Sequence, residues 1–499
     1  MKNAIPYRIP ILTVLLFLYL LLLSFANGHI GLSYDEAHWT YMGQQWLEGD
    51  LVLYKEAVDN KQPAIFLLFG LCAFLVGPGF ILPRIIGSLA LALAGLLVYR
   101  IARLIHDERA GLISFLLYAC SVSWVAAGWR FTAQTESFVV LFSTLAVYLL
   151  LRGANKGVVS PRTFLAAGLI IGLALAFKQS AVFGLLVLFV AVFLSISKNR
   201  LQAALLIFGS AVAIPLLLLL IPFLQGAELS EIADQLLTAS TIGKTNSLQE
   251  RWTIFYSRFM PQNVRLVVFI IGIAALLVYA GALKQKLMLY FLCSWVALEF
   301  IALNIAGNYA TYQLRTWLPA LSVSAGIGLA LTERIASKRW AMDKVSNALI
   351  VLVLVIALEL PRQSVWALDM AIRGHPAGYT IIPVPHSKPI DIARRYLGEW
   401  VYANTSAEQT VYIAGYGAQV QAYAMRKSPT RYFSGQARNV GALSKELSEN
   451  PPYLVLIPNF REYEEWIPLT QRNVVSELVQ RNYVLREERL GYRVYRRNE

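Results

Sequence analysis

The stretch LQAALLIFGSAVAIPLLLLLIPFL, residues 201–224, contains 24 residues and no charged side chain. A helix of this length can cross a hydrocarbon core that is about 30 Å thick. Further long apolar runs recur between Ile9 and Leu360, and 57% of the chain is hydrophobic while only 15% is charged. Because a soluble core cannot bury so many such runs, the sequence predicts a polytopic α-helical membrane protein.

The basic residues predict how the chain crosses the membrane, because cytoplasmic loops are rich in Lys and Arg. The apolar segment 63–77 is short and ends at Gly77-Pro78-Gly79, which favours an interfacial or re-entrant helix over a crossing. If it does not cross, all the basic loops fall on the cytoplasmic side, together with the N-terminus. These loops contain Arg100/Arg103/Arg109, Arg152/Lys156/Arg162, Lys198/Arg200, Lys284/Lys286 and Arg334/Lys338/Arg339/Lys344.

About eleven spans follow from this topology, counted from the sequence pattern. They are 11–26, 83–105, 110–128, 137–152, 162–177, 180–196, 201–224, 264–283, 287–305, 313–331 and 346–360. The first span also resembles a signal peptide at Ser24-Phe25-Ala26, but the many later spans favour a signal anchor. An odd number of spans places the C-terminal part outside the cytoplasm.

Two domains are predicted. Residues 1–360 form a transmembrane catalytic domain, whose first external loop, 27–82, carries juxtamembrane helices. Residues 361–499 are polar and turn-rich, which is typical of a soluble extracytoplasmic α/β domain. Its expected strands are Thr410–Ala414, Tyr453–Ile457 and Tyr492–Tyr495, and its expected helices lie near Ile390–Tyr402 and Tyr463–Gln480.

The net charge of +14 does not indicate nucleic-acid binding, because the basic residues lie in short loops between apolar runs. The cysteines, Cys72, Cys120 and Cys293, lie in apolar segments and have no metal-ligand spacing. The histidines are scattered, and His38 is expected on the surface. We therefore predict neither a cofactor nor a divalent metal.

Some charged residues at the outer ends of the predicted helices are not explained by the orientation rule. Cations that converge at a membrane surface are suited to a lipid phosphate, although each could instead snorkel or pair with an acid, as Arg130 could with Glu136. The candidate site residues are Asp35, Glu36, Asp59, Lys61, Arg84, Arg130, Glu136, Lys178, Arg251 and Arg258.

Asp35 and Glu36 open an amphipathic helix, Ala37 to Leu47. Acids in a first turn stabilise a helix through its dipole, and this structural role is one interpretation of the pair. The other interpretation is catalytic, because one general base and a cationic phosphate clamp suffice for inverting transfer of a sugar from a lipid phosphate.

At these positions the chain resembles the GT-C superfamily, in particular the protein O-mannosyltransferase and aminoarabinose (lipid A) transferase group. The similar segments are Tyr34-Asp35-Glu36-Ala37-His38-Trp39-Thr40-Tyr41, Asp59-Asn60-Lys61-Gln62-Pro63, Pro83-Arg84-Ile85, Arg130–Glu136 and Ala176-Phe177-Lys178-Gln179. The chain differs from the family at Gln62, Asn60 and Tyr312-Gln313.

The resemblance implies a GT-C fold, with Asp35 as catalytic base and Glu36 beside it. It also implies that Lys61 and Lys178 hold the lipid phosphate with support from Arg84, that no metal is needed, and that the setting is a bacterial inner (plasma) membrane.

The expected function is transfer of a sugar from a polyprenyl-phosphate (undecaprenyl-phosphate-like) donor to a lipid, glycan or protein acceptor on the extracytoplasmic face. The predicted loop 225–263 is hypothesised to close on the donor through Lys244, Arg251 and Arg258. The alternative is a transporter or flippase of lipid-linked sugars, although the central parts of the predicted spans are almost free of charge apart from Glu299.

Overall fold

The structure is a computed structural model of the 499-residue chain. It describes residues 8–26, 31–123, 131–155, 159–195, 199–238, 247–259, 263–282, 286–306, 309, 311–340, 389–435 and 437–498. The chain divides into two compact units. The helical unit contains the described residues of 1–26, 84–218 and 241–340, and the mixed unit contains those of 27–83, 219–240 and 389–498.

Long apolar helices make up the helical unit. They are α1 (Arg8–Phe25), α4 (Ile81–Ile105), α5 (Glu108–Val122), α6 (Thr135–Asn155), α7 (Pro161–Phe177), α8 (Val182–Ser195), α9 (Arg200–Leu224), α12 (Asn263–Val278), α13 (Leu287–Ala306) and α14 (Leu318–Trp340). A helix thus occupies each predicted span from 11–26 to 313–331. The remaining predicted span, 346–360, and the predicted domain boundary at 360 lie outside the described residues.

Shorter elements connect these helices. The predicted loop 225–263 contains the helix α11 (Leu248–Phe259). The 3-10 turns are η3 (Gln179–Ala181), η6 (Ala280–Ala282) and η7 (Thr311–Thr316). Because η7 occupies the start of the predicted span 313–331, the helix there begins only at Leu318.

Among the described helices, α4, α6, α9 and α13 are long and apolar enough to cross a membrane. The helix α9 has a mean hydropathy of 2.8, yet only 11% of its apolar window is buried in the protein. A protein that exposed such an apolar surface to water would aggregate, whereas lipid solvates this surface. The exposed apolar faces therefore support the membrane class.

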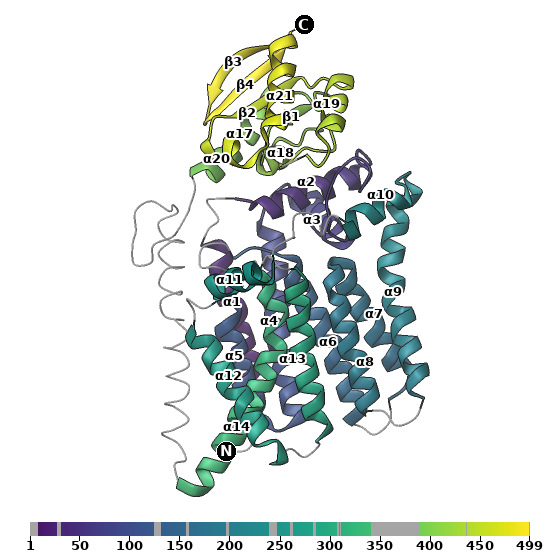
Figure 1. Cartoon of the computed structure of the whole chain (residues 1–499), viewed down its shortest axis with the longest axis vertical. Helices are drawn as coiled ribbons and strands as arrows, with labels where there is room; N and C mark the ends of the chain where they lie inside the picture. Colours follow the sequence, from purple (N-terminus) through teal and green to yellow (C-terminus); the bar gives the residue numbers. More distant parts are fainter. Residues whose placement is uncertain are drawn as a thin grey trace. The chain divides into compact units, whose positions relative to one another are not determined.

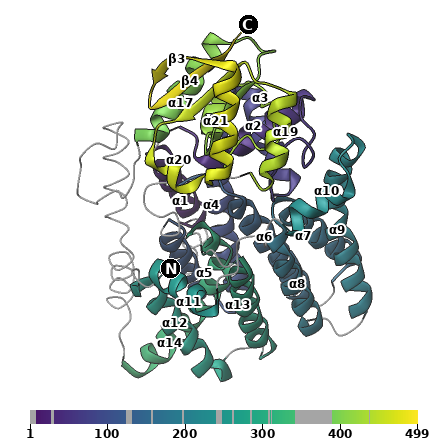
Figure 2. The same ribbon diagram turned by 45° about the horizontal axis from the view of Figure 1, so that its top comes forward.

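Small residues allow helices of the bundle to approach closely. A Cβ built on Gly172 of α7 would lie 2.6 Å from the carbonyl oxygen of Ala211 in α9, and Gly168 faces Ile207 and Ser210 in the same way. This use of glycine is typical of helix contacts within a bilayer. The helices α6, α7, α8 and α9 lie next to one another in Figure 1, and Figure 2 shows the same order from another direction.

The mixed unit begins with two crossing helices, α2 (Tyr34–Glu48) and α3 (Pro63–Val76). A Cβ on Gly43 would collide with the backbone of Phe66, and a Cβ on Gly70 would collide with the backbone of Gly43. The two backbones therefore touch where the helices cross. The same unit contains α10 (Leu229–Ala233) and a π-helical turn, η4 (Asp234–Thr238).

Residues 389–498 form a four-stranded sheet with helices on both faces. The strands are β1 (Val411–Ile413), β2 (Leu454–Pro458), β3 (Tyr483–Arg489) and β4 (Tyr492–Arg497), in the order β1-β2-β4-β3. The β1–β2 pair is parallel and the other pairs are antiparallel. The helices are α17 (Pro389–Asn404), α18 (Ala418–Ala424), α19 (Val440–Glu449), α20 (Arg461–Trp466) and α21 (Leu469–Asn482).

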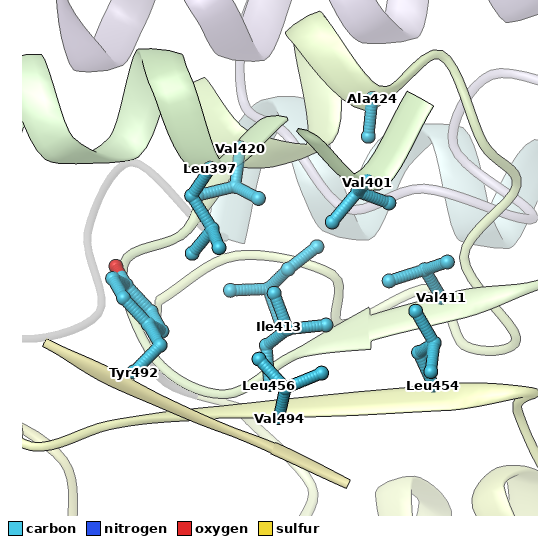
Figure 3. Close-up of a cluster of buried hydrophobic side chains, with 10 residues drawn as sticks. All are labelled: Leu397, Val401, Val411, Ile413, Val420, Ala424, Leu454, Leu456, Tyr492 and Val494. Carbon is cyan, nitrogen blue, oxygen red and sulfur yellow. The ribbon is translucent and has the colours of Figure 1, made fainter. Parts of the chain in front are cut away.

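Two hydrophobic cores hold these layers together. On one face, Leu397 and Val401 of α17 and Val420 of α18 pack against strand residues such as Ile413 and Leu456, as Figure 3 shows. On the other face, α19 and α21 contribute Leu443, Leu447, Val475 and Val479, which pack against Tyr412 and Val455. Alternate residues of β1 and β2 thus point to opposite cores, as a pleated strand requires.

Candidate functional site

The N-terminus of α2 is held by a capping box. The Glu36 backbone NH donates to the Ser33 hydroxyl at 3.3 Å, and the Ser33 backbone NH donates to the Glu36 carboxylate at 2.9 Å. Glu36 is fully buried, and its carboxylate is held at the helix start. Glu36 thus fixes the first turn of α2, where Asp35 lies half-buried beside it.

Asp59 joins α2 to the loop that precedes α3. One carboxylate oxygen, Oδ2, lies 3.1 Å from Nε2 of His38, and the other, Oδ1, accepts a hydrogen bond of 2.9 Å from the Lys61 backbone NH. The Lys61 ammonium lies 3.9 Å from Oδ1 and donates to the Asn60 side chain at 2.7 Å. The Asp59 backbone NH donates to Gln235 of η4 at 2.9 Å. The structure therefore brings predicted residues Asp59 and Lys61 together.

The expectation that His38 lies on the surface is wrong. Only 8% of His38 is exposed, and its ring stacks on Phe433 with 4.6 Å between the centroids. His38 follows Asp35 by three residues, so both lie on one side of α2. That spacing is the signal in the sequence that could have identified His38.

The groups around Asp59 favour its ionised form, so ionisation of Asp59 contributes to the stability of the mixed unit. Burial opposes ionisation, but the Lys61 ammonium and the His38 ring outweigh burial and lower the pKa of the Asp59 carboxyl from 3.8 to about 2. A depressed pKa stabilises the folded state at every pH above the unfolded value. This contribution is lost as the pH falls from about 4 towards 2.

We expect the melting temperature of the protein in detergent to fall between pH 4 and pH 2, and this fall to be smaller in Asp59→Asn. The asparagine cannot ionise, so its interactions do not change over this range. The measurement is thermal unfolding across the pH series, with Glu399→Gln, which changes an exposed acid, as the control. Equal pH slopes for wild type and Asp59→Asn would contradict the expectation.

In the helical unit, the buried Glu136 and the partly exposed Lys178 form an ion pair. Glu136 opens α6 and is fully buried, and its Oε1 accepts from the Lys178 ammonium. Its other oxygen, Oε2, accepts a hydrogen bond of 2.9 Å from the Thr135 hydroxyl. Lys178 is the C-cap residue of α7 and directly follows its last residue, Phe177. Both residues were predicted site residues, and the structure brings them together.

Arg315 joins this pair, although the sequence analysis did not identify it. It is only 1% exposed, its guanidinium donates to the Ser137 hydroxyl at 3.1 Å and to the Thr132 carbonyl at 3.4 Å, and it lies 4.7 Å from the Phe131 ring. Its Nε has no hydrogen-bond partner among the described residues. The signal in the sequence was a charged residue in the short turn before Leu318.

The remaining predicted cations have other positions. Arg84 is buried at the start of α4 and donates to the Ser24 carbonyl at 3.0 Å. Arg251 of α11 donates to the Asn304 carbonyl at 3.2 Å. Arg130, Lys244 and the side chain of Arg258 lie outside the described residues. The Asp59–Lys61 group belongs to the mixed unit, whereas Arg84, Arg251 and the Glu136–Lys178 pair belong to the helical unit.

Within the part of the chain that the structure describes, no three His, Cys, Asp or Glu side chains are grouped to hold a metal ion. The expectation that the protein needs no metal stays a prediction.

Comparison with known proteins finds one matching family model and several solved structures with a similar fold. Residues 59–224 match the family model of dolichyl-phosphate-mannose-protein mannosyltransferases. No curated protein sequence matches the chain. Among solved structures, ArnT from Cupriavidus metallidurans bound to undecaprenyl phosphate is similar with a TM-score of 0.59 and 15% identity, over 99% of this chain and 98% of ArnT.

Two further structures share the fold. The oligosaccharyltransferase AglB from Archaeoglobus fulgidus, in complex with an inhibitory peptide and a dolichol-phosphate, has a TM-score of 0.56 and 15% identity over 99% of this chain and 74% of AglB. The arabinofuranosyltransferase AftD from Mycobacteria has a TM-score of 0.56 and 13% identity over 98% of this chain and 40% of AftD. The predicted resemblance is confirmed: the chain has the fold of the GT-C glycosyltransferases, and its residues 59–224 match the dolichyl-phosphate-mannose-protein mannosyltransferase family.

Proposed function

We propose that the protein transfers a sugar from a polyprenyl-phosphate donor to an acceptor on the extracytoplasmic face of a bacterial plasma membrane. The observation that carries this proposal is the excess of positive charge in the helical unit, where the partly exposed Lys178 and the buried Arg315 accompany one carboxylate among the described residues, that of Glu136. Buried charges are costly unless an opposite charge is near. A lipid phosphate would supply the missing negative charge, and both side chains are suited to bind it.

Asp35 is the base in this proposal. Its carboxylate accepts the proton of an acceptor hydroxyl or amine, and the resulting nucleophile attacks the anomeric carbon of the sugar. The bond between that carbon and the phosphate oxygen breaks, and the electron pair leaves with the polyprenyl phosphate. No covalent intermediate with the enzyme is formed, so the configuration of the anomeric carbon is inverted.

Lys61 binds the departing phosphate in the same scheme, and Asp59 positions it. The contacts of Asp59 with the Lys61 backbone, the Lys61 ammonium and His38 restrict the loop before α3. A restricted ammonium loses less conformational entropy when it binds an anion than a freely rotating one. His38 and Asp59 are positioning residues, since neither is proposed to touch the reacting atoms.

We expect Lys61→Ala to weaken binding of polyprenyl phosphate by about ten- to a hundredfold, because a hydrogen bond to a charged group contributes about 1.5–3 kcal/mol. The measurement is a titration of the purified protein with undecaprenyl phosphate. The control is Lys445→Ala, which removes an exposed lysine of α19. Unaltered affinity in Lys61→Ala would remove Lys61 from the phosphate site.

A flippase of lipid-linked sugars is the second candidate, because the carboxyl of Glu299 is buried within α13. Ionisable groups inside membrane helices often mark a transport path. Purified protein in liposomes distinguishes the two functions. Movement of a donor across the bilayer, lost in Glu299→Gln and with no glycosylated product, would favour the flippase.

A further inference from the structure

The mixed unit contains a pocket of about 450 Å³ that the proposed transfer chemistry does not use. The C-terminal half of α2 forms one side of it with Tyr41 and Gln45, and the loop 50–56 continues that side. The opposite side comes from the segment 427–431 and the end of α19. A pocket of this volume is in the range of small-ligand sites.

The charges in the lining are balanced and largely paired with one another. Its acids are Asp50, Glu56 and Glu446, and its bases are Lys55, Lys427 and Arg431. Asp50 pairs with Lys427, and Glu446 accepts from the Arg431 guanidinium at 2.7 Å. The Glu56 carboxylate accepts from the Val52 backbone NH at 2.7 Å. The balance leaves no excess charge for an anionic ligand, so it favours a neutral polar one.

One buried acceptor in this lining is not satisfied by the protein. Gln45 is only 4% exposed, and its Nε2 donates to Glu48 at 3.1 Å. Because a carboxylate can only accept, this hydrogen bond fixes which end of the amide is the nitrogen. The other end, Oε1, has no hydrogen-bond partner among the described residues. A buried acceptor of this kind calls for a donor such as a hydroxyl group.

Most of the lining residues carry a polar side-chain group, and Leu51 and Pro429 are the exceptions. Hydroxyl, amide and charged groups of this kind can donate to and accept from the hydroxyl groups of a sugar. Gln45 lies ten positions after Asp35 on the same helix, which corresponds to about 15 Å along the axis at 1.5 Å per residue. A chain of a few linked sugars could extend over this distance.

We propose that this pocket binds a neutral saccharide segment of the acceptor, some sugar units away from the hydroxyl that receives the new sugar. The proposal rests on the proposed function and specifies its acceptor class: an oligosaccharide or the glycan part of a glycolipid. Gln45 accepts a hydrogen bond from a sugar hydroxyl, and Asn450 at the open edge donates and accepts.

The test is saturation-transfer NMR on the full-length protein in detergent, with neutral linear trisaccharides of glucose, galactose, mannose and N-acetylglucosamine as probes. We expect at least one trisaccharide to bind, and Gln45→Leu and the edge variant Asn450→Ala each to weaken this binding by up to about tenfold. The matched control is Gln44→Leu, since Gln44 is also buried, also donates to Glu48 and does not line the pocket.

Several results would overturn the proposal: no binding of any neutral trisaccharide, equal weakening by Gln44→Leu, or preferential binding of phosphorylated saccharides. Because Asn450 is exposed, its variant tests the pocket even if Gln45→Leu does not fold. Binding of trisaccharides is measured without donor or transfer. An Asp35→Asn protein that still transfers sugar would therefore refute the proposed base but would not affect the proposed saccharide pocket. A wild-type protein that binds none of the trisaccharides would refute the saccharide pocket but not the proposed base.

Discussion

Asp35→Asn is expected to reduce sugar transfer by about a hundred- to ten-thousandfold, which is the usual contribution of a general base. Asparagine has nearly the same shape as aspartate but cannot accept the acceptor's proton. The capping box between Ser33 and Glu36 does not use the Asp35 side chain, so α2 should start at the same residue in the variant. The measurement compares product formation from a series of polyprenyl-phosphate sugars and cell-envelope acceptors.

Donor binding separates a chemical defect from a folding defect in this experiment. Asp35→Asn should bind undecaprenyl phosphate as tightly as the wild type, because the proposed phosphate ligands are unchanged. Glu399→Gln, an acid-to-amide change in the exposed face of α17, is the control for the substitution itself. Transfer that persists at the wild-type rate in Asp35→Asn would show that another group removes the proton.

Lys178→Met is expected to lower the free energy of unfolding by about 3–5 kcal/mol, because it leaves the buried Glu136 carboxylate without its partner. The double variant Glu136→Gln/Lys178→Met removes both charges of the pair and should recover part of this loss, since the buried Arg315 guanidinium then lacks the Glu136 carboxylate. Methionine retains the length and apolar character of the lysine stem. The measurement is denaturant or thermal unfolding of the single and double variants in the same detergent.

The same double variant shows whether Lys178 has a role beyond the ion pair. If Lys178 binds the donor phosphate, undecaprenyl phosphate should bind more weakly to the double variant even though part of its stability is restored. If affinity returns together with stability, Lys178 serves only to neutralise Glu136. This comparison is needed because the pair is consistent with both roles.

The helices of the membrane part could be predicted because a long uncharged apolar run is stable in few environments except as a helix in lipid. The helices α4 and α9 begin and end close to the predicted spans 83–105 and 201–224. The turn η7 was missed, although Pro319 in the first turn of α14 is a sequence signal for a helix that begins near Leu318.

In the C-terminal part, three strands were predicted because their apolar residues are buried, and these are confirmed as β1, β2 and β4. The strand β3 was missed because four of its seven residues are charged and its neighbouring apolar residues Val484 and Leu485 are both exposed, so it lacks the apolar alternation of a buried strand. The predicted helix near Tyr463–Gln480 is wrong as one element. It is interrupted after Trp466, and Pro468, which has no backbone NH to donate, caps the second helix, α21.

The residues of the candidate site were also predicted only in part. Motif order identified Asp59, Lys61, Glu136 and Lys178 as separate site residues, and the structure pairs Asp59 with Lys61 and Glu136 with Lys178. The residues His38 and Arg315 were not recognised, because their importance depends on burial beside a carboxylate that is distant in the sequence. The catalytic role of Asp35 stays a prediction.

The contact between Gly43 and Gly70 limits how the proposed base can move during a catalytic cycle. Where two backbones touch, there is no side chain whose rotation could let one helix slide over the other. The helices α2 and α3 should therefore shift as a rigid pair, with the change in direction taken up outside the pair, for example at Gly77, which follows α3 and has a φ angle of 80°. Engineering that aims to widen the range of accepted substrates should leave this crossing untouched and vary the loop residues around it.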